Sequence, residues 1–60
     1  MSEAKAVALA QTLHGKAEAA LGPLARQMAQ EKWPHYARAI MWRSVSAVAD
    51  EMAVEEDQHG

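Results

Sequence analysis

The sequence predicts an all-α protein of three helices, long, short and long, that form a helical hairpin and assemble as a dimeric bundle. Three observations predict this. Apolar residues recur every three or four positions along most of the chain, half of all residues are apolar with alanine abundant, and Pro occurs at only two places. The spacing is typical of helices with one apolar face, alanine is the best helix former, and proline marks where helices begin or end.

The first predicted helix covers residues 2–21. Ser2 is a suitable N-cap, and Glu3 in the first turn complements the helix dipole. At about 100° per residue, one apolar face is formed by Ala6, Leu9, Ala10, Leu13, Ala17, Ala20 and Leu21. We expect Gly22-Pro23 to separate this helix from the next, because Gly is favoured just past a helix end and Pro just inside a helix start. A kink in one continuous helix is the alternative.

The second predicted helix is short and covers residues 23–32, with Leu24 and Met28 facing inward. It is too short to be stable without tertiary packing. The residue before a proline is disfavoured in helical geometry, so Trp33 should interrupt the chain. Pro34 should then occupy the first position of the last helix, where its missing N–H has no partner to lose.

The last predicted helix covers residues 34–55 and organises the rest of the chain. Met41, Val45, Val48 and Met52 follow one another at steps of four, three and four, the spacing of a heptad seam. Flanking apolar residues leave only a narrow polar strip, and a helix of this kind is buried on more than one side. We expect the core of a homo-oligomer, most simply a two-fold dimer, to contain Ile40, Met41, Val45, Val48 and Met52. The acidic end opposes the helix dipole, so residues 56–60 should form a frayed tail.

Size supports this expectation. Sixty residues form one domain close to the lower limit for unaided folding, and no Cys is present to form a disulfide. Oligomerisation is the remaining way to add stability. The sequence shows neither a secretory leader nor an apolar run long enough to span a membrane, so a cytoplasmic location is expected.

Residues for catalysis are scarce. The three His are scattered, the only local ligand-like pair is Glu56 with His59 near the end, and no Gly-rich phosphate loop occurs. Neither Ser44 nor Ser46 has an obvious base nearby in sequence. We therefore expect no enzyme activity, no metal and no cofactor.

All three aromatic residues lie within ten positions and alternate with basic ones. The predicted partner-binding residues are Trp33, Tyr36, Arg38, Trp42 and Arg43, since Trp, Tyr and Arg are enriched at interface anchors. Internal packing of the tryptophans is the competing interpretation. The expected function is a small regulator, adaptor or inhibitor that binds a larger protein.

Two alternatives to this function remain open. One is a nucleic-acid-binding regulator that uses Arg26, Lys32, Arg38 and Arg43, although a pI of 5.8 is low for such a protein. The other is an accessory subunit whose apolar surface is covered by a different chain.

Overall fold

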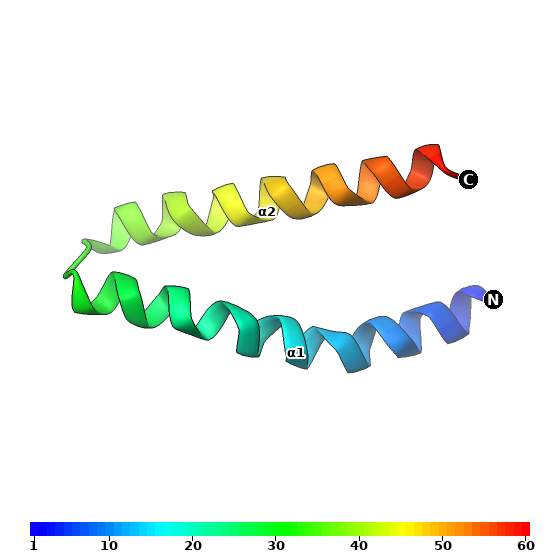
Figure 1. The fold of residues 1–60 in the computed structure, drawn as a ribbon, viewed down its shortest axis with the longest axis horizontal. Coiled ribbons are helices and arrows are strands. Elements are labelled where there is room, and N and C mark those ends of the chain that lie inside the picture. Colours follow the sequence, from blue (N-terminus) through cyan, green and yellow to red (C-terminus); the bar gives the residue numbers. More distant parts are fainter.

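The computed structural model describes all residues from 1 to 60 and contains two α-helices joined by a tight turn (Figure 1). Helix α1 spans Glu3–Gln30 and helix α2 spans His35–Gln58, with lengths of 28 and 24 residues. They run in opposite directions, so both termini lie at the same end (Figure 1). The all-α prediction is confirmed, whereas the prediction of three helices is wrong.

The first two predicted helices, 2–21 and 23–32, are a single helix that passes through Pro23. A break here would create two new helix ends, each with four unpaired backbone groups. A proline inside a continuous helix removes one hydrogen bond and bends the axis, a smaller loss when good helix formers lie on both sides. Helix α1 is accordingly bowed along its length (Figure 1). The kink, not the break, is what the Gly22-Pro23 pair produces.

The predicted starts of the first and the last helix agree with the structure to within a residue. Ser2 is the N-cap of α1, and its hydroxyl accepts a hydrogen bond of 3.2 Å from the backbone N–H of Lys5. Pro34 is the N-cap of α2 rather than its first residue. Helix α2 also continues to Gln58, three residues beyond the predicted end at 55, and fraying of residues 56–60 stays a prediction.

The turn between the helices ends α1 in a left-handed residue. Lys32 has φ 58°, and its N–H donates to the Ala29 carbonyl at 3.1 Å. The Trp33 N–H reaches back to the Met28 carbonyl at 3.0 Å. These two bonds define a Schellman motif, in which the left-handed position is usually Gly. Lysine occupies that position here, although its Cβ disfavours the conformation.

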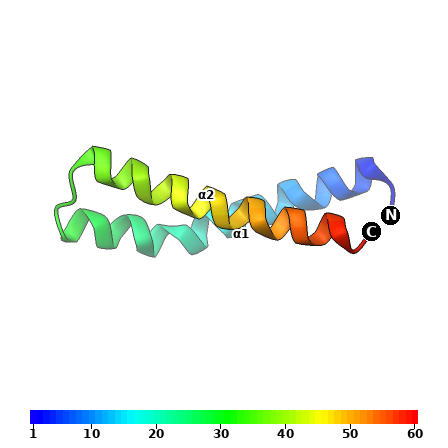
Figure 2. The ribbon, with the colours of Figure 1, turned by 90° about the horizontal axis from the view of Figure 1, so that it is seen from above.

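The two helices approach each other only near the turn and diverge toward the termini (Figures 1 and 2). No two Cα atoms twelve or more residues apart come within 8 Å. Met28, at 4% exposure, is the one buried residue. The chain measures 44 × 23 × 13 Å, so it is one helix thick. Its radius of gyration is 14.7 Å, against about 10 Å for a compact chain of this length.

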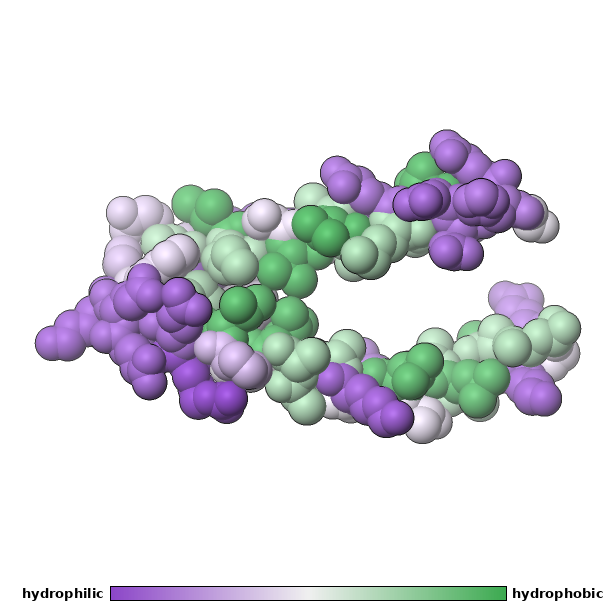
Figure 3. Space-filling view, viewed as in Figure 1, coloured by the Kyte–Doolittle hydropathy of each residue, from purple (hydrophilic) through white to green (hydrophobic).

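Much apolar surface is left open as a result. The accessible surface is 5288 Å², whereas a compact monomer of 6.5 kDa exposes about 3,800 Å². In the space-filling view apolar side chains gather where the two arms meet and continue along the lower arm, α1, whereas the far end of the upper arm, α2, is mostly hydrophilic (Figure 3). The large apolar residues that stay exposed within the helices are Val7, Leu9, Leu13, Tyr36, Ile40, Val48, Met52 and Val54. Neither helix has a stretch long and apolar enough to cross a lipid bilayer.

Candidate functional site

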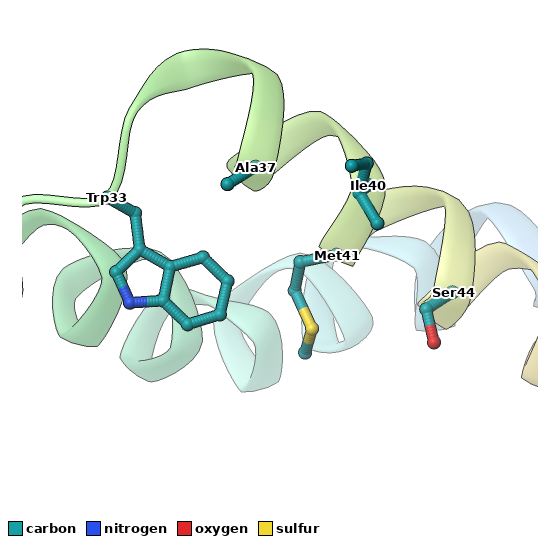
Figure 4. A pocket seen from close by; sticks show the side chains of 5 residues that line it. All are labelled: Trp33, Ala37, Ile40, Met41 and Ser44. Atoms are coloured by element: carbon teal, nitrogen blue, oxygen red, sulfur yellow. The ribbon is translucent and has the colours of Figure 1, made fainter.

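The most distinctive surface feature is an open apolar groove of about 320 Å³ beside the turn. We call it the turn-end groove, and it is lined by Trp33, Ala37, Ile40, Met41 and Ser44 (Figure 4). Four of these five residues are apolar, and all come from the turn or the first turns of α2. Helix α1 contributes none of them, but the Trp33 and Met41 side chains point toward α1 (Figure 4), where they also line a smaller pocket with Leu24 and Met28. The groove can accept an apolar side chain from another molecule.

Trp33 forms one wall of this groove and is held by three hydrogen bonds. Its N–H donates to the Met28 carbonyl at 3.0 Å, and its indole Nε1 donates to Glu31 Oε1 at 3.0 Å. Its carbonyl oxygen accepts from Arg38 Nε at 2.8 Å. A second, smaller pocket is lined by Trp33 together with Leu24, Met28 and Met41. The indole is thus fixed in position while remaining half-exposed.

The Glu31 carboxylate supports the indole. Its second oxygen accepts a hydrogen bond of 2.9 Å from Gln27 Nε2. The indole bond and then the Gln27 bond lower the pKa of the Glu31 carboxyl below its usual value, because both bonds favour the charged form. The turn is therefore held by polar contacts that depend on an ionised Glu31.

The predicted partner-binding residues form a turn-end cluster, Trp33, Tyr36, Arg38, Trp42 and Arg43, whose members lie on different sides of α2. Tyr36 is 73% exposed, and Arg43 is also exposed, on the outer side away from α1. Trp33, Arg38 and Trp42 are half-buried nearer to α1. The structure brings Trp33 and Arg38 together through the hydrogen bond above. Tyr36 and Arg43 are exposed to solvent on one face of α2, where they lie two helical turns apart.

The predicted oligomer-core residues are all accessible in the single chain. Met41 and Val45 are half-buried near the turn, where α1 is close. Further along α2 the helices have diverged, and Val48 and Met52 are 49% and 63% exposed. Ile40 lies in the groove and is 60% exposed. The hairpin alone leaves every member of this set with surface to bury.

Charge divides the hairpin along its length. The turn half carries four basic side chains and one acidic one, Arg26, Glu31, Lys32, Arg38 and Arg43. The open end of α2 carries five acidic side chains and no basic one, Asp50, Glu51, Glu55, Glu56 and Asp57. None of these ten side chains forms an ion pair within the chain, since the one such pair joins His14 to Glu18 at 2.9 Å. Both charged regions are therefore free to meet charges on another molecule.

Sequence reasoning missed the roles of Gln27 and Glu31. Their spacing of four residues on a helix was an available signal for a side-chain pair. The hydrogen bond from the Trp33 indole to Glu31 was not predictable in that way, because it depends on the left-handed turn at Lys32. Arg38 stays a predicted partner-binding residue, and its Nε also donates to the Trp33 carbonyl in the turn.

No group of three or more His, Cys, Asp or Glu side chains is arranged to hold a metal ion. No protein-family model matches the chain, and comparison with curated proteins and with solved structures finds no similar protein.

Proposed function

We propose that this chain is a non-enzymatic helical interaction protein, a regulator, adaptor or inhibitor, that works as a homodimer and binds a larger protein through the turn-end cluster. The observation that carries this proposal is the unburied surface. The chain exposes roughly 1,500 Å² more than a compact monomer of its mass. Obligate dimers bury about 1,000–2,500 Å² per chain, so the excess is of the size that one dimer interface covers.

The form of the hairpin supports the same proposal. Domains are built from at least two packed layers of secondary structure, and this chain provides one. A second layer has to come from another molecule. Homo-oligomers with two-fold symmetry are the commonest solution.

Partner binding is assigned to the turn end because an anchor there is already ordered. Trp33 is held by three hydrogen bonds, one of them to its indole, and the residue is only half-buried. Binding through a pre-ordered aromatic side chain avoids most of the entropy loss of immobilising it. Exposed Tyr36 and Arg43 add the residue types enriched at binding hot spots.

A capture experiment tests this assignment. Immobilised parent protein, a Tyr36→Ala,Arg43→Ala variant and a matched control are exposed to extract of the native host. The control is Asp50→Ala,Asp57→Ala, which changes two exposed residues of the same outer strip at the other end of α2. We expect the parent and the control to retain the same protein partner, and the turn-end variant to lose it while keeping its helix content. Equal retention by all three proteins would refute the turn-end assignment.

Nucleic-acid binding is the second candidate, favoured by the four basic residues of the turn half and by the engagement of their one acidic neighbour, Glu31, with Trp33 and Gln27. Binding to phosphates weakens steeply as salt rises, whereas a packed aromatic interface changes little. A titration against duplex and single-stranded oligonucleotides at two salt concentrations distinguishes the two functions. An accessory subunit would instead copurify in fixed ratio with a different chain. The cytoplasmic location expected from the sequence stays a prediction.

A further inference from the structure

The heptad seam of α2 has the same residue types at the same spacings when followed from either end of the helix. Met41, Val45, Val48 and Met52 are separated by four, three and four residues, so the order is Met, Val, Val, Met either way. The midpoint of this seam lies between Ser46 and Ala47. That is also the midpoint of α2, which spans His35–Gln58. A helix with such a seam is complementary to a second copy of itself running in the opposite direction.

From this symmetry we propose that two copies of the chain pair with their α2 helices antiparallel, on a two-fold axis that passes between Ser46 and Ala47. The inference rests on the homodimer of the proposed function and specifies how that dimer is built. In this arrangement Met41 lies level with the partner's Met52, and Val45 with the partner's Val48. Each contact occurs twice, as a two-fold interface requires.

The part of the turn-end groove formed by Met41 is covered by the second copy in this arrangement, while the Trp33 end stays open for the larger protein partner. Met41 forms one edge of the groove, and the partner's Met52 lies level with Met41. Met52 is 63% exposed in the single chain and has nothing to pack against. Methionine is flexible enough to fill an irregular apolar recess. Near the turn α1 buries Met41 and Val45 only in part, so both keep surface that a second copy can cover.

Charge selects the antiparallel direction. A parallel pair would place the two basic turn halves together and the two acidic ends together. The antiparallel pair places the turn half, with four basic residues and one acidic residue, beside the partner's five acidic residues. Opposite charges across the interface therefore favour the antiparallel pair, and like charges disfavour the parallel pair.

One ion pair follows from the helical geometry. Arg38 and Glu56 are eighteen residues apart, about five full turns, so they lie on the same side of α2. A two-fold axis brings that side of one helix against the same side of the other. Arg38 then lies within one residue, about 1.5 Å along the axis, of the level of the partner's Glu56. Arg38 Nε is occupied by the Trp33 carbonyl, which leaves the two terminal nitrogens for the carboxylate.

Charge reversal tests this pair. Glu56→Arg replaces two attractive contacts per dimer by two repulsive ones and should raise the dimer dissociation constant about tenfold. Asp57→Arg is the control, because it makes the same charge change at the next residue, about 100° further round the helix. It should change the constant less than about threefold. The Arg38→Glu,Glu56→Arg variant, in which opposite charges face each other again, should recover most of the lost affinity. Equal effects of the two single variants, or no recovery in the double variant, would overturn the pair.

A distance measurement tests the direction itself. The chain has no cysteine, so Gln30→Cys carries one spin label at the turn end of each copy. Because the hairpin is 44 Å long, the antiparallel dimer should give a label separation of about 35–40 Å in pulsed electron resonance. A separation near 20 Å, about two helix diameters, would overturn the antiparallel arrangement and leave the proposed homodimer standing. A monomer in sedimentation of the same labelled sample would overturn both.

Discussion

Replacing Lys32 by Gly should stabilise the protein, because this residue holds a conformation that suits glycine. Its φ is 58°, in the left-handed region, and its N–H closes the end of α1 by bonding to the Ala29 carbonyl at 3.1 Å. A residue with a Cβ loses about 1–2 kcal/mol there. Glycine removes that loss but adds about 0.5–1 kcal/mol of entropy to the unfolded chain. The net gain is about 0.5–1 kcal/mol per chain.

Thermal unfolding followed by circular dichroism measures this gain. Unfolding entropy near 2.1 cal/mol/K per residue amounts to about 0.13 kcal/mol/K for sixty residues, so Tm should rise by about 4–8 °C at fixed protein concentration. Lys32→Ala is the control, since it removes the charge but keeps the Cβ, and it should leave Tm within about 2 °C of the parent. A Tm for Lys32→Gly equal to or below that of Lys32→Ala would show that the left-handed turn is not the conformation of the folded chain.

Three further predictions concern other parts of the hairpin. Gly15→Ala should raise the free energy of unfolding by about 1 kcal/mol in urea titrations, because no atom lies within 4 Å of an added Cβ; a loss of stability would mean that another molecule packs there. Val48→Asp should dissociate or unfold the protein in sedimentation and circular dichroism, whereas Asp50→Ala should alter stability by at most about 0.5 kcal/mol; equal melting temperatures would place the seam elsewhere. Because its folded pKa is depressed, ionised Glu31 stabilises the folded chain above its ordinary pKa of 4.5, and this contribution is lost as pH falls through the lower folded value. The Tm difference between the parent and Glu31→Gln should therefore be largest near neutral pH and vanish in acid, while a difference independent of pH would exclude the charged hydrogen bond to Trp33.

Local signals in the sequence were sufficient for the helix starts and for the joint between the helices. The Ser2 cap and the interruption at Trp33-Pro34 depend on single residues whose backbone preferences are strong, and both are present. The Gly22-Pro23 pair carries an equally strong local signal but does not end a helix. A kink at Pro23 costs one backbone hydrogen bond, whereas a break would leave the backbone groups of two new helix ends unpaired. Good helix formers lie on both sides of the pair, so the helix continues through it with a kink.

The arrangement around the turn depends on contacts that no periodic pattern encodes. The Trp33 indole meets Glu31 because Lys32 adopts the left-handed conformation, for which the usual sequence signal is glycine. Arg38 reaches the Trp33 carbonyl only once that turn has formed. The aromatic and basic composition of this segment marked it as distinctive, but composition alone did not separate the exposed Tyr36 from the half-buried Trp42.

Sedimentation equilibrium of the purified chain shows whether this hairpin buries its apolar surface against a second copy. We expect a helical species of about 13 kDa, twice the 6.5 kDa of one chain, at micromolar concentration. Its Tm should rise as the protein is concentrated, since association and folding are linked. A folded species of 6.5 kDa whose Tm does not change with concentration would exclude the homodimer.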